Sequence, residues 1–142
     1  YGERLDADVI AGLRTRFGPD LVLKPVVSAS AADTFLLREG DETAGVCATL
    51  DGRPWLAQAF MPGIVEEGEF SLIYFDGELS HALLKIAGPG DFRVQESWGG
   101  TIRPARPEPL LLQRAGEVMA QVGAVSSVPK TKCIGTAFRR PK

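Results

Sequence analysis

The chain has 142 residues, of which 44% are hydrophobic and 24% are charged, and its formal charge is only −2. This balance is typical of one ordinary soluble globular domain. It excludes a disordered tail, a fibrous repeat and a nucleic-acid binder that acts through bulk positive charge. No apolar run approaches the ~20 residues that cross a bilayer. We therefore expect neither a nucleic-acid nor a membrane partner.

Two features bear on where the protein works and on its completeness. Cys47 and Cys133 lie far apart, with no cysteine or histidine at metal-ligand spacing nearby. That pattern favours plain thiols in a reducing cytoplasm over a disulfide framework. The chain begins at Tyr1 and its first methionine is Met61, so we expect it to be a piece of a longer protein.

The first 54 residues predict two helices and two strands. Asp6 is placed to cap the first helix and Gly18 to stop it. Pro25 would suit a central strand only where its missing N–H faces away from the ladder. The expected elements are a helix over about 6–17, a strand from residue 21 to 27, a small-residue loop over 28–33, a strand over 34–37, a helix over about 40–50 and a turn over 51–54.

The remaining residues predict a hairpin and a long helix. Asp76-Gly77 suits a two-residue primed turn between two strands. The expected elements are a buried strand over 55–61, hairpin strands over 69–75 and 79–86, and an amphipathic helix over about 108–123 that follows a Pro-rich run. Strands and hairpins mixed with segregated helices indicate an α+β fold.

Spacing rules reveal no familiar catalytic motif. The sequence has no Walker loop, dinucleotide glycine fingerprint, Gly-x-Ser-x-Gly elbow or zinc-ligand cluster. A Ser/His/Asp hydrolase would have to use His81, the only histidine, and a structural or merely exposed role is the better interpretation of this residue.

The polar segments that interrupt the strands form an ordered set. They are Lys24-Pro25 before Ser28-Ala29-Ser30-Ala31, then Gln58-Ala59-Phe60-Met61-Pro62, Gly68-Glu69-Phe70-Ser71, Asp76-Gly77-Glu78 with Ser80-His81-Ala82 and Lys85, and Gly90-Asp91-Phe92-Arg93-Val94-Gln95 before Gly99-Gly100. This order resembles the ATP-grasp ligases over roughly residues 20–125. The likeness is greatest to the branch that includes bacterial glutathione synthetase and the cycloserine-forming cyclo-ligase. It implies that residues 1–142 form a partial ATP-grasp domain, with antiparallel sheets and helices packed on one side.

The resemblance implies a nucleotide-binding role for eight residues. Lys24 would contact the α and β phosphates, and the loop that contains Ser28 and Ser30 would fold over them. In the family this loop is often rich in glycine, whereas here it is Ser-Ala-Ser-Ala-Ala. The linker Gln58, Ala59, Phe60 and Met61 would recognise adenine, and Glu69 would accept hydrogen bonds from the ribose hydroxyls. An exposed strand-end lysine and a buried strand that ends at a proline are the plainer interpretations.

Two cations are implied for the transferring phosphoryl group. Lys85 interrupts an apolar strand, and Arg93 lies in a loop flanked by glycines, where a guanidinium can bind phosphate or carboxylate oxygens bidentately. Gln95 and Gly99-Gly100 would belong to the substrate side. Asp91 receives no role.

The resemblance does not extend to the segment after the long helix, where family members carry their magnesium ligands. Family members carry carboxylates after the long helix that hold Mg²⁺ between the β and γ phosphates. Residues 129–142 instead contain five basic residues and no acid, a composition usually found in a solvated tail. We therefore assign no metal ligand in this chain and expect Mg²⁺ ligands to lie outside it or to be missing.

These observations predict the ATP-binding core of an ATP-dependent carboxylate–amine ligase that works through an acyl phosphate. The isolated chain would be nearly inactive, with ATP and a small carboxylate or amine substrate as the parent's ligands. The alternative is a non-catalytic ATP-grasp remnant that acts as a nucleotide-binding or interaction scaffold. Apolar strand edges left uncovered in such a piece would allow homo-oligomers to form.

Overall fold

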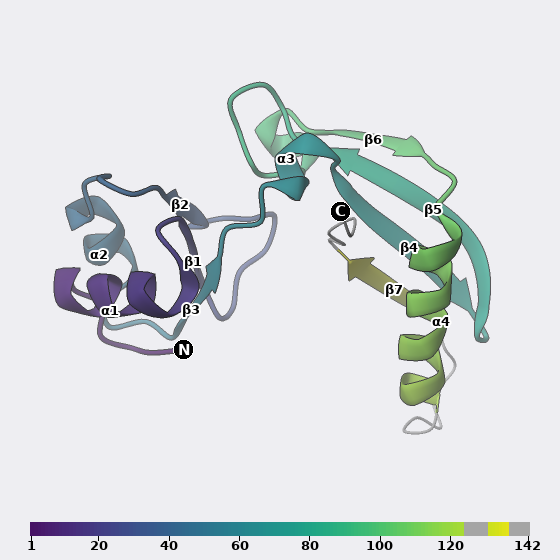
Figure 1. The fold of residues 1–142 in the computed structure, drawn as a ribbon, viewed down its shortest axis with the longest axis horizontal. Helices are drawn as coiled ribbons and strands as arrows, with labels where there is room; N and C mark the ends of the chain where they lie inside the picture. Colours follow the sequence, from purple (N-terminus) through teal and green to yellow (C-terminus); the bar gives the residue numbers. More distant parts are fainter. Residues whose placement is uncertain (124–130, 137–142) are drawn as a thin grey trace. The chain divides into compact units, whose positions relative to one another are not determined.

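A computed structural model describes residues 1–123 and 131–136 of the chain, with side chains up to residue 121. The chain divides into two compact units, Tyr1–Met61 and Pro62–Lys142, a division that the sequence did not predict. Each unit has its own sheet and its own hydrophobic cluster and is described by itself (Figure 1).

The first unit is a three-stranded antiparallel sheet with two helices. Its strands are ordered β2-β1-β3. Its elements are α1 (Ala7–Phe17), β1 (Leu21–Pro25), β2 (Phe35–Leu37), α2 (Ala44–Leu50) and β3 (Trp55–Ala59). The predicted helix over 6–17 is confirmed, because the Asp6 side chain accepts the backbone N–H of Val9 at 2.9 Å and α1 ends at Gly18.

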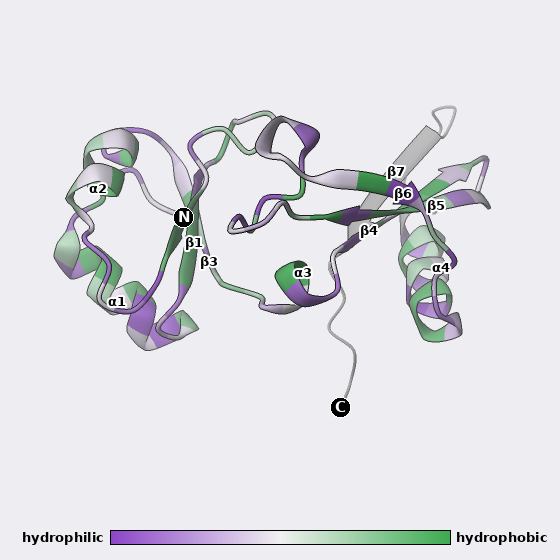
Figure 2. Cartoon of the chain, turned by 90° about the horizontal axis from the view of Figure 1, so that it is seen from above, coloured by the Kyte–Doolittle hydropathy of each residue, from purple (hydrophilic) through white to green (hydrophobic). Residues whose placement is uncertain are grey.

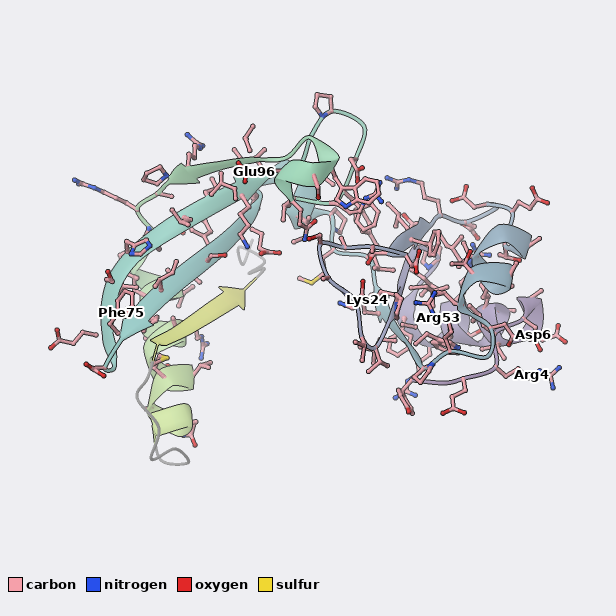
Figure 3. The ribbon with its side chains drawn as sticks, turned by 180° about the vertical axis from the view of Figure 1, so that it is seen from behind. Arg4, Asp6, Lys24, Arg53, Phe75 and Glu96 are labelled. Carbon is pink, nitrogen blue, oxygen red and sulfur yellow. The ribbon has the colours of Figure 1, made fainter. Side chains whose placement is uncertain are left out.

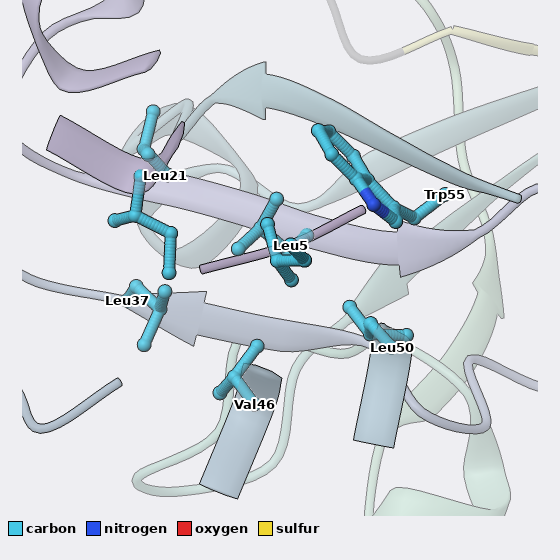
Figure 4. Packing of buried hydrophobic residues seen from close by; sticks show 8 residues of the cluster. Leu5, Leu21, Leu37, Val46, Leu50 and Trp55 are labelled. Carbon is cyan, nitrogen blue, oxygen red and sulfur yellow. The ribbon is translucent and has the colours of Figure 1, made fainter. Parts of the chain in front are cut away.

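One hydrophobic cluster joins both helices to one face of this sheet (Figure 4). Leu21 and Leu23 point to the same face of β1 because strand residues alternate, and both are fully buried. The buried members of the cluster are Leu5, Ile10, Leu21, Leu23, Leu37, Val46, Leu50 and Trp55. Helices therefore cover one face of the sheet, as the predicted fold class requires.

Pro25 is compatible with the central strand because it lies at the end of the ladder. The pairing of β1 with β2 ends at Leu23, whereas the pairing with β3 continues to Pro25 opposite Trp55. Only one neighbour is present at this position, so a residue without an N–H is tolerated.

Three predicted boundaries in the first unit are wrong. The strand expected over 21–27 ends at Pro25, where its pairing with β3 ends. The second helix begins at Ala44 rather than at about residue 40, because Gly40 has a φ of +86° and the Asp41 N–H bonds to the Arg38 carbonyl in a turn. The predicted strand over 55–61 ends at Ala59, since its partner β1 begins at Leu21. It is also not buried throughout, because an edge strand with one face on a core alternates between buried and exposed residues.

The second unit is a four-stranded antiparallel sheet ordered β6-β5-β4-β7. Its elements are α3 (Gly63–Glu66), β4 (Glu69–Phe75), β5 (Glu78–Ile86), the 3₁₀ turn η1 (Glu96–Trp98), β6 (Thr101–Pro104), α4 (Pro109–Gly123) and β7 (Thr131–Thr136). The sequence did not predict α3, η1 or β6, which are all four residues or shorter. All four residues of strand β6 are exposed at the edge of the sheet, and self-association through such an edge stays a prediction.

The predicted hairpin is confirmed. Asp76 and Gly77 have φ values of +51° and +88°, as a type I′ turn requires. The strands pair from Phe75 opposite Glu78, and the register then shifts between Ile73 and Tyr74. This shift leaves Ser80 on β5 without an opposing residue, which is a β-bulge.

The long helix α4 covers one face of this second sheet. Leu111, Ala115 and Met119 are buried in a cluster with Leu72, Tyr74 and Ala82. Figure 2 shows hydrophobic and hydrophilic residues alternating along α4, as in an amphipathic helix. The helical apolar spacing also predicts Val118 and Val122 on this face. That prediction is wrong for Val118, which is 42% exposed, and the side chain of Val122 lies outside the described residues.

The α+β class, with antiparallel sheets and helices on one face of each, is confirmed. No helix among the described residues is long and apolar enough to cross a membrane.

Candidate functional site

The first sheet has a second face, opposite α1 and α2, that carries polar residues of the predicted site. Since Leu21 and Leu23 face the helices, Val22 and Lys24 lie on the other side of β1. The register places Gln58 opposite Val22 and Leu56 opposite Lys24. We call this set, Val22, Lys24, Leu36, Leu56 and Gln58, the lysine face.

Lys24 is the unpaired cation of this face. Its side chain is half-buried on β1 (Figure 3), and within the part of the chain that the structure describes it forms no ion pair. Gln58 is a diagonal neighbour on β3, within reach of a long side chain. Two predicted site residues are therefore brought together on one surface.

The predicted phosphate loop adopts a conformation that favours glycine. Ser30, Ala31 and Asp33 have φ values of +53°, +56° and +52°. Such left-handed backbone costs a residue with a Cβ roughly 1 kcal/mol. The Ser28 hydroxyl donates to the Ala32 carbonyl at 2.7 Å, and Arg53 pairs with Asp33 at 2.9 Å, so the loop is held by its own contacts.

The predicted adenine linker follows β3. Ala59 ends the strand, and Phe60 and Met61 lie beyond it. The Phe60 N–H already donates to the Asp20 carbonyl at 2.9 Å, so this donor is engaged. The Arg38 guanidinium lies 5.5 Å from the centroid of the Phe60 ring and pairs with Asp20 at 3.3 Å. Sequence reasoning missed Arg38 and Asp20, because only the fold brings them beside residue 60.

In the second unit the structure pairs two residues to which separate roles were assigned. Lys85 Nζ lies 3.3 Å from Glu69 Oε1, and each side chain is about one quarter exposed (28% and 26%). The bulge at Ser80 creates this pair, because an unbulged ladder would place Leu84 opposite Glu69. Both residues lie on the sheet face opposite α4, since Leu72 and Tyr74 face that helix.

Gly68 brings the backbone before β4 close to this pair. A Cβ on Gly68 would lie 2.5 Å from the Lys85 carbonyl oxygen, and its φ of +87° also favours glycine. Ser71, on the same face as Glu69, is buried, and its hydroxyl has no partner among the described residues.

Arg93 lies in the loop between β5 and β6 and is held by Asp91. Arg93 Nε donates to Asp91 Oδ1 at 2.9 Å and Nη2 donates to Oδ2 at 2.7 Å. The same guanidinium lies 3.4 Å from the centroid of the Trp98 ring. Hydrogen bonds from the Arg93 side chain, and then from the backbone N–H groups of Arg93 and Phe92, lower the pKa of Asp91 to about 2, although burial acts in the opposite direction.

Asp91, which received no role from the sequence, is therefore the partner of a predicted catalytic residue. The spacing Asp-x-Arg could have signalled this contact, because side chains two residues apart in a turn can meet. The Gln95 side-chain oxygen is also buried without a partner among the described residues.

His81 does not form a catalytic triad within the described residues. It is exposed on β5, its Nδ1 lies 3.0 Å from the Ser80 hydroxyl, and no described carboxylate contacts it. The same part of the chain contains no group of three His, Cys, Asp or Glu residues that could hold a metal ion.

Comparisons with known proteins agree with the motif order. No protein-family model matches the sequence. The chain is 30% identical over 122 residues to a glutathione synthetase of Brucella melitensis biotype 1, an alignment that covers 83% of this chain and 37% of the relative. It is 31% identical over 124 residues to a glutathione synthetase of Salmonella typhimurium, which covers 84% of this chain and 36% of the relative.

A solved structure extends this likeness to the fold. The crystal structure of a D-cycloserine synthetase matches with a TM-score of 0.56 and 20% identity, over 89% of this chain and 44% of that one. The chain spans little more than a third of the length of the curated relatives it matches. Its α+β fold is ATP-grasp-like over the part of that structure it matches, and the chain resembles the ATP-grasp ligases through its sequence similarity to bacterial glutathione synthetases.

Proposed function

We propose that this chain supplies the ATP-binding residues of an ATP-dependent carboxylate–amine ligase. The observation that carries the proposal is Lys24, a half-buried cation with no counter-charge among the described residues, beside Gln58 on the sheet face opposite α1 and α2. An unpaired ammonium at such a place suits a polyphosphate, because no existing ion pair has to be broken.

The first unit would hold the nucleotide through three groups. Lys24 would bind the α and β phosphates, and the loop that contains Ser28 and Ser30 would donate backbone N–H groups to them. Gln58, Ala59, Phe60 and Met61 would surround adenine. Because the Phe60 N–H bonds to Asp20, the polar contacts to the base would come from the other linker residues.

The second unit would supply cations for the phosphoryl group. In the proposed reaction a carboxylate oxygen attacks the γ-phosphorus and ADP leaves, and an amine then attacks the acyl carbon and releases phosphate. Lys85 and Arg93 would stabilise the charge on the transferring oxygens. Glu69, assigned to the ribose, is paired with Lys85 and would also orient its ammonium.

Magnesium does not fit the described residues. They hold no cluster of three possible ligands, and residues 128–142, after the long helix, contain no Asp or Glu. We assign no step to a metal held by this chain.

The missing carboxylates favour one alternative, a non-catalytic scaffold that binds nucleotide without transferring phosphate. Both functions require ATP binding at the lysine face. They differ in turnover, since only the ligase would release ADP when a carboxylate and an amine are supplied.

Calorimetric titration with Mg-ATP tests the proposal. We expect saturable binding that weakens at least tenfold in Lys24→Ala, whereas Arg93→Ala stays within a few-fold of the wild type because Arg93 serves the transferring group. The matched control is Arg16→Ala, which removes an exposed cation that stacks on Phe17 on helix α1. Absence of saturable heat with the wild type, or equal losses in Lys24→Ala and Arg16→Ala, would refute ATP binding by this face.

A further inference from the structure

The guanidinium of Arg93 is held on two sides. Asp91 binds its Nε and Nη2 edge through both carboxylate oxygens, at 2.9 Å and 2.7 Å, and Trp98 lies against its flat face with the ring centroid at 3.4 Å. The side chains of Arg93 and Asp91 are 21% and 19% exposed. The ion pair is therefore partly shielded from water, yet Arg93 can still be reached by a ligand.

Asp91 is itself fixed by the backbone. Its Oδ1 accepts the N–H groups of Phe92 at 2.7 Å and of Arg93 at 2.9 Å. The carboxylate therefore cannot rotate without losing two backbone hydrogen bonds. The lowered pKa of Asp91 keeps the group ionised at every ordinary pH.

Trp98 is fixed by the tight return of the loop. The N–H groups of Trp98 and Gly100 both donate to the Gln95 carbonyl, at 2.9 Å and 3.1 Å. A Cβ on Gly100 would clash with the Val94 carbonyl oxygen, so only glycine permits this approach. The backbone of Trp98 is consequently held where its ring lies against the guanidinium.

Other arginines of the described chain are held less firmly. Arg4 also uses Nε and Nη2, at 3.0 Å and 2.9 Å, but both contact the single oxygen Oδ2 of Asp6, and the Arg4 side chain is 85% exposed. Arg114 pairs with Glu117 at 3.1 Å and Arg53 pairs with Asp33 at 2.9 Å, each through one guanidinium nitrogen and with side chains about half exposed. Surface pairs of this kind restrain an arginine weakly. The Asp91–Arg93 pair, by contrast, fixes the orientation of the Arg93 guanidinium.

We infer that Asp91 is a positioning residue that holds Arg93 so that its Nη1 group faces an oxyanion ligand. Asp91 uses the Nε–H and one Nη2–H, which leaves Nη1 without an acceptor among the described residues. An arginine held in this way loses little freedom when it binds phosphate or carboxylate oxygens. The inference rests on the proposed function, in which the oxyanion is the transferring phosphoryl group.

The test follows the Arg93 Nε–H resonance by NMR, assigned through its loss in Arg93→Lys. We expect slow solvent exchange of this proton in the wild type and at least tenfold faster exchange in Asp91→Asn, with partial recovery in Asp91→Glu. Glu117→Gln, which removes the carboxylate partner of Arg114, is the matched control and should leave the Arg93 signal unchanged. Unchanged exchange in Asp91→Asn would overturn the inference.

A second readout concerns the ligand. Inorganic phosphate, and acetate in a separate arm, are titrated into the chain saturated with Mg-ADP. We expect phosphate affinity to fall about tenfold in Asp91→Asn while Mg-ADP affinity stays within twofold, a separation that general loss of structure would not produce. A loss confined to acetate would keep the positioning role and assign the oxyanion as a carboxylate.

Equal affinities in wild type and Asp91→Asn for both anions would contradict the inference. Failure of the wild type to bind Mg-ADP would instead refute the proposed function. In that case the exchange of the Arg93 proton in the free protein still decides whether Asp91 positions Arg93.

Discussion

The ionised carboxylate of Asp91 contributes to the stability of the second unit. Its pKa of about 2 in the folded chain lies below the usual value of 3.8, first because of the Arg93 side-chain hydrogen bonds. A lowered folded-state pKa stabilises the fold above about pH 4 and ceases to do so as the pH falls towards 2. With part of the pair in contact with water, the effect is on the order of 1–2 kcal/mol.

We therefore predict that the free energies of unfolding of the wild type and of Asp91→Asn become more similar as the pH is lowered. Urea unfolding followed by Trp98 fluorescence should show the variant about 1–2 kcal/mol less stable at pH 6, with a much smaller difference at pH 2. If the two free energies of unfolding differ by the same amount at pH 6 and at pH 2, ionisation of the Asp91 carboxylate does not stabilise the fold.

Particular residues show how far the sequence predicts the site. Lys24 and Gln58 come together because strand alternation and register follow from the apolar pattern. Glu69 and Lys85 lie opposite each other only because of the bulge at Ser80. A serine at that position does not by itself predict a bulge. The Asp91 contact depends on the tight loop closure at Gly100, which is a tertiary feature.

At the scale of elements, the loop over 28–33 has the least favourable backbone. Ala31 has a φ of +56°, whereas Ala32 is not among the residues with positive φ. We predict that Ala31→Gly stabilises the first unit by up to about 1 kcal/mol, because the ~1–2 kcal/mol cost of left-handed backbone that glycine removes exceeds the ~0.5–1 kcal/mol that it adds through freedom of the unfolded chain.

Ala32→Gly is the matched control for this substitution. It should be neutral or destabilising by about 0.5–1 kcal/mol, because it adds only freedom to the unfolded chain. Thermal unfolding followed by Trp55 fluorescence measures both variants. A loss of stability in Ala31→Gly would mean that contacts within the loop outweigh its backbone strain.

The elements that the sequence predicts well are those with a local signal. Helix α1 has its Asp6 cap, the hairpin has Asp76-Gly77, and α4 has a helical apolar pattern. Short elements escape prediction because their residues are fixed by neighbours. Strand β6, for example, exists because residues 101–104 lie beside β5, although all four are exposed.

At the scale of the whole molecule, the two hydrophobic clusters share no residue. Trp55 lies in the first unit and Trp98 in the second, so each unit has its own fluorescent reporter. We predict that Ile10→Ala, which truncates a fully buried side chain of the first cluster, costs the first unit about 2–4 kcal/mol.

The second unit should respond little to that change. Equilibrium unfolding of single-tryptophan variants would show the Trp55 transition moved to lower urea and the Trp98 transition nearly unmoved. Equal displacement of both transitions would mean that the units unfold as one cooperative structure.

The measurement that tests the central claim most directly is NMR mapping of backbone amide shifts during titration with Mg-ATP. In the first unit the account predicts saturable changes at Lys24, Leu56 and the linker 58–61, with little change along the solvent-facing side of α1. Lys24→Ala should suppress these changes, whereas Arg16→Ala should preserve them. Absence of saturable shifts, or shifts confined to α1 and α2, would contradict nucleotide binding at the lysine face.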